Sequence, residues 1–364
     1  MPDDYVVRPF LEEDEEEFLD LHANVFGDKP AEWFNWKYSE NPYIDHVPIL
    51  TVEEVQTGRC VGFRPHLALK LRKGSWRGVG LQPCDTIVHP DHRRQGLFTK
   101  MTQAAICKYK DEDIGFFFNF PNEQSRPGYL KLGWEVVGEM QTETRIRSPS
   151  AWGKASPNRF LELAGTVANP LMRGFLNLVD FQFSFSNTGS TIRKYEKPPA
   201  QLLSSISKTG TADKFNLHRT KDFYEWRYSR PDIEYSFYIA NRDGESKAAL
   251  ITAEIGSVLM PTTAIVEAVE HQDGSCEDQD WFELMRAVIE NSDSKAIQMF
   301  AGDIPRHITR RLGFFSSSSF PLSRLQNPPQ LVAYPLSTDG NSLNNEKVLE
   351  LQEWDLSWSA WDVV

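Results

Sequence analysis

The hydrophobic positions of the first 140 residues switch between two periods, and this switching predicts an α/β domain. Apolar residues recur with strand-like spacing over residues 5–10, 46–54, 60–74, 80–90 and 114–120. They recur at helical spacing over residues 11–26, 30–38 and 96–113. The acidic run from Glu12 to Glu17 falls on the polar side of the first helix, so we interpret it as a solvated helix face.

Two short segments recur, in the same order, in the later part of the chain. "FNWKYSENP" at residues 34–42 is echoed by "YEWRYSRPD", with Trp36 and Trp226 separated by 190 residues. "KLGWEVVG" is echoed by "RLGFFSSS", with Gly133 and Gly313 separated by 180 residues. Two echoes in the same order and at nearly the same offset predict a duplication. The period of 180–190 residues is the size of a domain rather than of a small repeat, so the duplicated unit is expected to be a domain.

The segment between the two copies has a different character. Its ends are rich in Ser, Pro and Gly, and its middle has helical periodicity that is interrupted by Pro170. We therefore expect an N-terminal domain over residues 1–147, a helical linker over residues 148–195 and a C-terminal domain over residues 196–364. The aromatic tail, residues 351–364, is expected to form a final strand.

Composition narrows the class of protein and of partner. The 364-residue chain has 51 acidic and 39 basic residues and a net charge of −12, which argues against a nucleic-acid-binding face. Its most apolar stretch, residues 161–181, carries charges and a proline and is too polar to span a bilayer. The acidic N-terminus lacks a signal-peptide pattern, and the four cysteines show no metal or redox spacing. We expect a soluble, cytoplasmic protein without a membrane partner or a bound metal.

A basic turn follows the apolar stretch that ends at residue 90. The segment "RRQGLF" places Arg93, Arg94 and Gly96 just before a predicted helix. A helix N-terminus offers unpaired N–H groups and the positive end of a dipole. Gly96 lets an anion approach the backbone, the two arginines add charge, and Thr99 adds a hydroxyl group. The turn therefore predicts a pyrophosphate site.

A second motif follows the phenylalanine-rich strand. It consists of polar and aromatic residues at fixed spacing: Asn122, Ser125, Tyr129, Lys131, Leu132, Gly133 and Trp134. If this segment is helical, Asn122 and Tyr129 lie about two turns apart on one face. A tyrosine there can present its hydroxyl group to a reacting atom, and "KLGW" is typical of a helix end that runs into a strand.

Together the two motifs resemble the GCN5-related N-acetyltransferase (GNAT) superfamily. Its acyl-CoA motif, Arg/Gln-x-x-Gly-x-Gly/Ala, is matched by Arg93-x-x-Gly96-x-Phe98 except at the last position, and its Asn…Tyr…Gly motif is matched throughout, with Trp134 for Phe. The resemblance covers residues 5–140 well and the second copy only faintly. It implies an α/β (α+β) fold of two GNAT-like domains, each a mixed, mostly antiparallel sheet flanked by helices, with the second domain degenerate.

The resemblance also implies site residues and a co-substrate. Acetyl-CoA, or another acyl-CoA, would bind with its pyrophosphate on the turn and its pantetheine arm along the strand before it; the residues are Ile87, Val88, Arg93, Arg94, Gln95, Gly96, Leu97, Phe98, Thr99, Asn122 and Ser125. Tyr129 would protonate the departing thiolate. The implied activity is N-acylation of an amine, a small molecule or a peptide, by direct attack in a ternary complex.

Three other side chains can be interpreted either as site residues or as structural residues. Asp85, on the strand before the turn, is either the base that takes the amine proton or a carboxylate that a neighbour neutralises. Trp36 and Tyr38 are either aromatic anchors or part of the acceptor pocket. His89 and His92 lack a third ligand nearby in the sequence, so we interpret them as surface or capping residues.

The second copy lacks these features. Its corresponding turn contains four carboxylates and no arginine, Asp273, Glu277, Asp278 and Asp280, and such a turn would repel a pyrophosphate. We expect it to be catalytically silent and to form at most a wall of the acceptor site. Two alternatives remain for the whole chain: a CoA-sensing or binding module, and a FemABX-like aminoacyl transferase. A monomer or a homodimer is expected.

Overall fold

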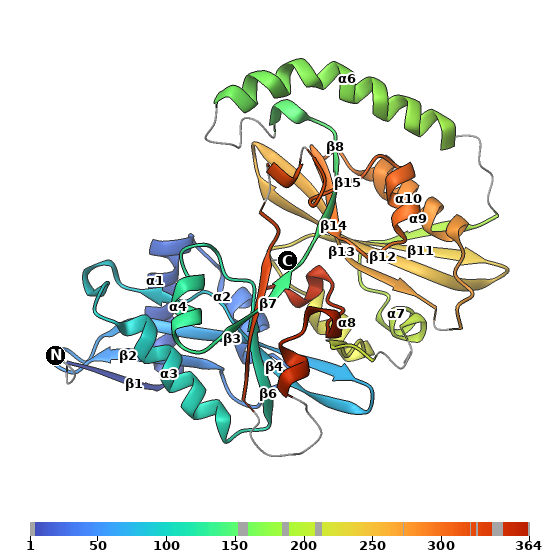
Figure 1. The fold of residues 1–364 in the computed structure, drawn as a ribbon. Coiled ribbons are helices and arrows are strands. Elements are labelled where there is room, and N and C mark those ends of the chain that lie inside the picture. The colour runs from blue at the N-terminus through green and yellow to red at the C-terminus, as the bar shows by residue number, and fades with distance from the viewer. Residues whose placement is uncertain are drawn as a thin grey trace.

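The computed structural model describes residues 4–151, 159–183, 189–207, 213–271, 273–320, 322–324, 327–336 and 345–362. Within these residues the chain forms two sheets, each flanked by helices, that lie side by side (Figure 1). This agrees with the expected α/β class of two mixed, mostly antiparallel sheets. No helix in the described part of the chain is long and apolar enough to cross a membrane.

The first sheet has the order β1-β2-β3-β4-β6-β16-β7. Its strands are β1 (Tyr5–Pro9), β2 (Ile49–Glu54), β3 (Cys60–Lys73), β4 (Trp76–Pro83), β6 (Ile114–Asn119), β7 (Glu135–Glu139) and β16 (Gln330–Pro335). Two short strands, β5 (Ile87–Val88) and β10 (Asn216–Leu217), also pair with β3. β4 and β6 are parallel, whereas the other neighbours are antiparallel.

Helices cover both faces of the first sheet. They are α1 (Glu15–Phe26), α2 (Ala31–Phe34), which continues as one wider turn over Asn35–Ser39, α3 (Leu97–Lys110) and α4 (Arg126–Lys131). The run "FFF" of β6 follows from this arrangement, because a strand covered on both sides is apolar at every position. Phe117 packs with residues of α3 and α4, whereas Phe116 and Phe118 belong to the core on the opposite face.

The second sheet has the order β15-β8-β14-β13-β12-β11-β9. Its strands are β8 (Thr142–Ile146), β9 (Thr191–Tyr195), β11 (Tyr235–Arg242), β12 (Glu245–Ser257), β13 (Met260–Glu270), β14 (Ala296–Phe300) and β15 (Phe315–Ser316). Its helices are α6 (Arg159–Phe183), α7 (Ala200–Ile206), α8 (Lys221–Arg227), α9 (Asp278–Asn291) and α10 (Arg306–Arg311). α6 lies in the expected linker and runs through Pro170. As in the first sheet, a parallel pair, β13 and β14, lies at the centre.

The two halves exchange a strand, and the expected domain boundaries did not anticipate this. β8 directly follows β7 in the chain but pairs with β14 and β15 of the second sheet. β16 follows β15 but inserts between β6 and β7 of the first sheet. In Figure 1 the green β8 runs up into the orange sheet, and a red strand runs down beside β7. Residues 142–146 and 330–335 therefore belong to the sheet of the opposite half.

The echoed aromatic motifs meet where the halves join. Trp36 and Trp226 stack with ring centroids 5.8 Å apart. Each indole N–H donates to the other's carbonyl oxygen, over 2.7 Å from Trp36 and 2.9 Å from Trp226. Both side chains belong to a core that also contains Leu69 of the first sheet and Ile251 of the second. One hydrophobic core therefore joins the two sheets.

The C-terminal tail is not the strand that its aromatic pattern predicted. It forms short 3₁₀ turns over Leu351–Glu353 and Trp358–Ala360, after the brief helix α11 (Asn345–Val348). Side chains replace the hydrogen bonds that a neighbouring strand would have made with the tail. For example, Arg227 donates to the carbonyl groups of residues 359 and 361. The tail ends between the two halves (Figure 1).

Because of the exchanged strand, residues 1–147 alone should not fold cooperatively. Without β16, strands β6 and β7 each expose an unpaired edge, and the shared core loses one of its two sheets. Circular dichroism during heating should show one cooperative transition for the full chain and none for residues 1–147. A cooperative transition of the fragment would contradict this expectation.

Trp226→Phe should destabilise the protein more than the matched change Trp33→Phe. Both indoles are buried, but the Nε1 of Trp33 has no partner among the described residues. Trp226→Phe also leaves the Trp36 carbonyl without its donor, which costs about 1–3 kcal/mol. Denaturant titration should show a correspondingly larger loss of unfolding free energy for Trp226→Phe. Equal losses in the two variants would mean that the reciprocal bonds contribute nothing.

Candidate functional site

A cavity opens in the first half where its two parallel strands separate. β4 and β6 pair as far as Leu81 and Phe117, and beyond these residues the strands diverge. The cavity has a volume of about 830 Å³. Its lining residues are Val25, Phe26, Pro83, Cys84, Asp85, Thr86, Val88, His92, Arg93, Arg94, Gly96, Leu97, Phe98, Asn119, Phe120, Pro121, Asn122, Ser125, Tyr129, Trp361 and Asp362. Most of the predicted site residues thus surround one space.

The glycine turn has the conformation that an anion site requires. Gly96 has φ 76° and ψ 9°, in the left-handed region that glycine adopts without steric cost. Arg94 is also left-handed, with φ 64°. A Cβ atom at Gly96 would meet no described atom within 4 Å, so the space above this residue is open. Successive amides in such a turn form a concave surface that attracts anions.

The N-terminus of α3 is ready to accept a negative group. The helix starts at Leu97, and no described side chain caps it. Its first N–H groups and its dipole therefore face the cavity without a competing acceptor. Arg93 and Arg94 are exposed beside them. Gln95 lies outside the cavity lining and accepts a hydrogen bond from Tyr5.

The predicted main-chain contacts of Ile87 and Val88 are only partly available. β5 pairs with β3 on one side, and Val88 lines the cavity. The carbonyl oxygen of Val88 already accepts a hydrogen bond from Arg93 Nε at 3.1 Å. Ile87 is buried, and neither Ile87 nor Thr99 is among the described lining residues.

Tyr129 lies in the cavity wall with its hydroxyl group oriented by a neighbour. Its oxygen accepts a hydrogen bond from Asn119 Nδ2 at 3.0 Å. The Asn119 amide is fixed in turn, since its oxygen accepts from the backbone N–H of Phe120 at 2.8 Å. The hydroxyl hydrogen of Tyr129 therefore remains available for donation. The sequence analysis missed Asn119, although a lone polar residue at the end of an apolar strand could have revealed it.

Asn122 is not on the helix that carries Tyr129, contrary to the geometry expected from the spacing. α4 begins only at Arg126, and Pro127 lies in its first turn. A proline is tolerated there because N–H groups of the first turn have no partner within the helix. Asn122 instead accepts hydrogen bonds from the backbone of Gln124 and Ser125 at 3.0 and 2.9 Å. Its side chain orders the loop at the cavity mouth.

Phe98 replaces the small residue of the acyl-CoA motif and packs beneath the site. Its ring lies 5.4 Å from that of Tyr129, measured between centroids. A Cβ atom on Gly128 would meet Phe98 at 2.7 Å, so Gly128 makes room for the larger side chain. Fully buried Arg64 lies 4.9 Å from the Phe98 ring and 5.3 Å from the Tyr129 ring.

Asp85 is tied to a buried cation. It accepts hydrogen bonds from Lys37 Nζ at 2.5 Å and from the Tyr38 hydroxyl at 2.6 Å. Burial raises the pKa of Asp85, but the charge and hydrogen bond of Lys37 outweigh this, so the pKa lies below its ordinary value. A carboxylate with a lowered pKa accepts a proton poorly. The geometry therefore favours the interpretation of Asp85 as a neutralised carboxylate.

Asp362 enters the same cavity from the C-terminal tail. Its Oδ2 lies 3.5 Å from Lys37 Nζ. Burial raises the pKa of Asp362 above its ordinary value, Lys37 acts against this rise, and the charge of Asp85 adds to it. The cavity thus holds two carboxyl groups whose pKa values shift in opposite directions. The sequence analysis missed Asp362, because nothing local connects the tail with this cavity.

The two aromatic residues considered for the acceptor pocket serve elsewhere. Trp36 packs against Trp226 and is absent from the described lining residues, so the geometry favours the interpretation of Trp36 as an aromatic anchor. Tyr38 is buried and reaches the site only through its hydrogen bond to Asp85. His92 bonds with the Tyr5 hydroxyl, and His89 accepts from the backbone of Asp91, as expected of surface and capping residues.

The corresponding helix N-terminus in the second half is closed. α9 begins with a capping box formed by Glu277 and Asp280. Arg242 binds both carboxylates, at 2.9 and 3.0 Å, and Ser190 donates to Asp280 at 2.6 Å. The position that is open in the first half is therefore filled by the protein's own acids. This agrees with a pyrophosphate site in the first half alone.

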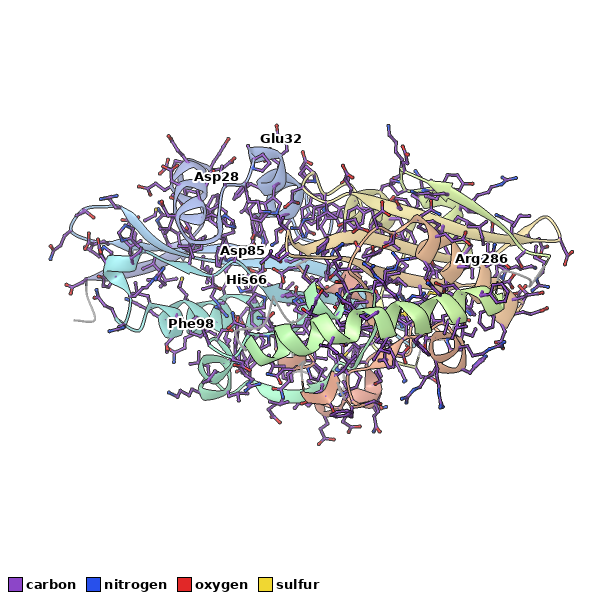
Figure 2. The ribbon with its side chains drawn as sticks, turned by 90° about the horizontal axis from the view of Figure 1, so that it is seen from above. Asp28, Glu32, His66, Asp85, Phe98 and Arg286 are labelled. Carbon is purple, nitrogen blue, oxygen red and sulfur yellow. The ribbon has the colours of Figure 1, made fainter. Side chains whose placement is uncertain are left out.

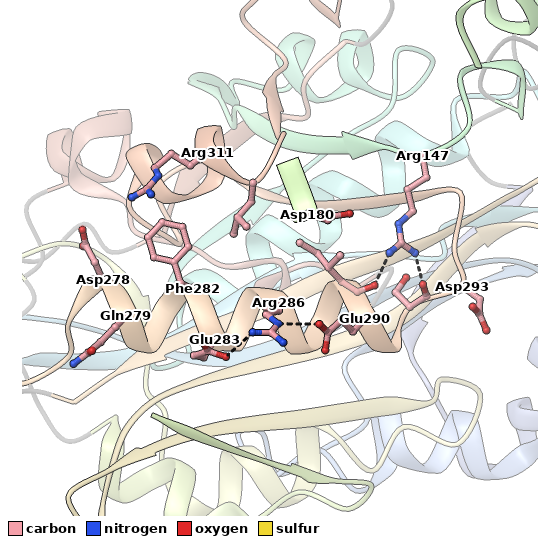
Figure 3. Close-up of a pocket in the computed structure, with 13 residues that line it drawn as sticks. Arg147, Asp180, Asp278, Gln279, Phe282, Glu283, Arg286, Glu290, Asp293 and Arg311 are labelled. Atoms are coloured by element: carbon pink, nitrogen blue, oxygen red, sulfur yellow. Dashed lines mark hydrogen bonds and ion pairs between the residues drawn. The ribbon is translucent and has the colours of Figure 1, made fainter. Parts of the chain in front are cut away.

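A second cavity, of about 630 Å³, lies between α9, α10 and the end of α6 (Figure 3). Arg286 binds Glu290 at 2.8 Å, Arg147 donates to the carbonyl groups of Ile289 and Ser292, and Arg311 stacks on a phenylalanine ring. Its arginines are therefore engaged within the protein. Figure 2 shows Arg286 toward the right of the molecule, whereas Asp85 and Phe98 lie to the left of its centre.

Comparison with known proteins agrees with this fold. Residues 6–137 match the acetyltransferase (GNAT) domain family. No curated protein matches the chain by sequence. A probable N-acyltransferase from Enterococcus faecalis V583 is similar in structure, with TM-score 0.61 and 13% identity over 92% of this chain and 72% of that chain.

Two further solved structures share the fold. A GCN5-related N-acetyltransferase from Anabaena variabilis has TM-score 0.55 and 13% identity over 92% of this chain and 73% of its own. Eis1 from Mycobacterium abscessus has TM-score 0.53 and 10% identity over 95% of this chain and 76% of its own. At these identities the likeness concerns the fold alone. Residues 6–137 therefore form a domain that matches the acetyltransferase (GNAT) family, and the chain as a whole shares the fold of these solved structures.

Proposed function

We propose that the protein is an acyl-CoA-dependent N-acyltransferase that transfers an acyl group, most simply acetyl, directly to an amine. One observation carries this proposal: an uncapped helix N-terminus with a left-handed glycine faces the same cavity as an oriented tyrosine hydroxyl. The helix N-terminus can bind the pyrophosphate of coenzyme A, and the tyrosine hydroxyl can donate a proton to the thioester sulfur.

The cavity suits an acyl-CoA in size and in chemistry. Its volume of about 830 Å³ lies within the range of small-molecule sites. The pyrophosphate would be held by the first N–H groups of α3, with Arg93 and Arg94 supplying charge. The pantetheine arm would lie along Val88 and Asn119 toward Tyr129. We propose Asn119 for this role in addition to Asn122, whose side-chain oxygen is already engaged by its own loop.

Tyr129 supplies a proton at the end of the cavity. When an amine attacks the thioester carbonyl, a C–N bond forms, the C–S bond breaks, and the sulfur leaves as a thiolate. Since the Tyr129 oxygen already accepts from Asn119, its hydrogen is free to pass to that sulfur. The amine must be neutral to attack, so a second group must first remove its proton.

The alternative of a silent CoA-binding module accounts for less of the site. A protein that only binds CoA has no need for a buried tyrosine whose hydroxyl group is oriented toward proton donation. The chain's net negative charge also disfavours a FemABX-like transferase, whose aminoacyl-tRNA substrate is polyanionic. We propose that the second half has no CoA site of its own, because α9 is already capped by acids.

Gly96→Glu should weaken CoA binding at least about 100-fold, because it places a carboxylate where the pyrophosphate binds. Gly58→Glu is the matched control. Gly58 has a similar φ of 70° and open space, but it lies in the turn between β2 and β3. Both variants incur similar backbone strain, of about 1 kcal/mol. Calorimetry with CoA should separate them, and equal affinities would refute the pyrophosphate site.

Tyr129→Phe should lower turnover about 100-fold while leaving CoA affinity unchanged, because it removes the proton donor but keeps the ring. Tyr109→Phe is the control, since Tyr109 is buried in the same cluster and its hydroxyl has no partner among the described residues. Thiol release from acetyl-CoA, measured with a panel of amines across pH, provides the readout. Full activity of Tyr129→Phe at every pH would exclude its role as acid.

A further inference from the structure

Two carboxyl groups lie close together in the cavity wall. Oxygens of Asp85 and Asp362, together with the Cys84 sulfur, all lie within 4.8 Å of one another. The ammonium group of Lys37 already sits among them, 2.5 Å from Asp85 and 3.5 Å from Asp362. A buried cation is thus part of the cluster, which leaves little reason for a metal ion there.

Lys37 is shared unequally between the two carboxyl groups. It holds its proton, since burial lowers its pKa but the charges around it, Asp85 above all, raise the pKa further. Its contact with Asp85 is 2.5 Å long, whereas its contact with Asp362 is 3.5 Å long. Arg230, another nearby cation, binds Asp232 at 2.6 Å. Asp362 is therefore the carboxyl group with the longer and weaker pairing, and it can pair with the ammonium group of a ligand.

The tail is held without the side chain of Asp362. The Asp362 N–H donates to the Gln82 side chain at 2.8 Å, and its carbonyl accepts from Arg230 at 2.8 Å. The preceding carbonyl group accepts from Arg227 at 3.0 Å, and the Trp361 ring packs on Phe120. These contacts fix the backbone without using the Asp362 carboxyl group, which lines the cavity and is paired with Lys37.

We propose that Asp362 is the catalytic residue that binds the ammonium group of the acceptor and takes its proton. This inference rests on the proposed function and assigns its missing base. A cationic amine would pair with the carboxyl group that Lys37 holds at the longer distance, and its nitrogen would lie in the cavity that Tyr129 also lines. The burial of Asp362, which disfavours its charged form, makes it the better proton acceptor of the two carboxylates.

The proton balance closes with these two residues. Asp362 takes one proton from R–NH₃⁺ and later releases it to water, and the neutral amine attacks the thioester carbonyl carbon. When the C–S bond breaks, Tyr129 gives its proton to the sulfur. The second proton that the nitrogen loses replaces the one that Tyr129 gave. The products are the amide, the free thiol and one proton in solution.

The walls around Asp362 indicate the class of amine. Phe26 lines the cavity although it is 53% exposed, and Phe120 and Trp361 line it as well. Aromatic side chains around a carboxyl group suit a primary amine on an apolar body, because the body is desolvated while the ammonium group is paired. We therefore choose 2-phenylethylamine as the probe.

Asp362→Asn tests the assignment, with Asp243→Asn as the control. Asp243 is exposed in the β11–β12 turn at φ 55°, which asparagine also adopts. Asp362→Asn should lower kcat/KM for 2-phenylethylamine about 100-fold or more, with melting temperature and CoA affinity unchanged. In the wild type, kcat/KM should rise as pH increases through the raised pKa of Asp362, since only the deprotonated carboxylate accepts a proton. The variant should lack this acidic limb.

The outcomes separate this inference from the proposed function. Activity of Asp362→Asn within threefold of wild type, with the acidic limb retained, overturns the role of Asp362 but not the enzyme. If the wild type binds CoA but does not turn over the probe, binding of 2-phenylethylamine to the CoA complex decides. At least tenfold weaker binding by Asp362→Asn supports the assignment, whereas equal binding, or none by the wild type, overturns it. Failure of the wild type to bind CoA overturns the proposed function itself.

Discussion

The exchange of β8 and β16 is the constraint on which the rest of the structure depends. Each sheet is completed between its last two strands by a strand from the opposite half. Because β16 lies between β6 and β7, the chain must return to the first half after building the second. This return leads the C-terminal tail into the joint between the halves. The second half thus contributes to the first, while its own helix N-terminus at α9 is capped by acids.

At the joint, the two similar aromatic motifs around Trp36 and Trp226 serve different purposes. In the first copy, the motif supplies Lys37 and Tyr38, which bind Asp85. In the second copy, Arg227 holds the backbone of the tail, and Tyr228 donates to Glu267. Trp36 and Trp226 join the two copies. Two similar motifs therefore order the cavity from one side and hold the tail from the other.

Local patterns were sufficient to predict most elements and the glycine turn before α3, because periodicity, glycine conformation and helix termini are set by nearby residues. They could not reveal the exchanged strands, since β8 and β16 look the same whichever sheet they join and their pairing depends on distant parts of the chain. The prediction of a strand in the tail was wrong for a related reason. The aromatic alternation of the tail suits a strand, but Arg227 and Gln82 supply its hydrogen bonds. Asn119 carried a local signal that was overlooked, whereas Asp362 carried none.

We propose that acyl-CoA binds in the first half, with its thioester between Tyr129 and the tail. A crystal structure of the chain with coenzyme A would test this binding mode. We expect the pyrophosphate on the first N–H groups of α3 beside Gly96, and the sulfur in the space lined by Tyr129 and Asp362. Coenzyme A bound at α9, or in the cavity beside Arg286, would contradict it.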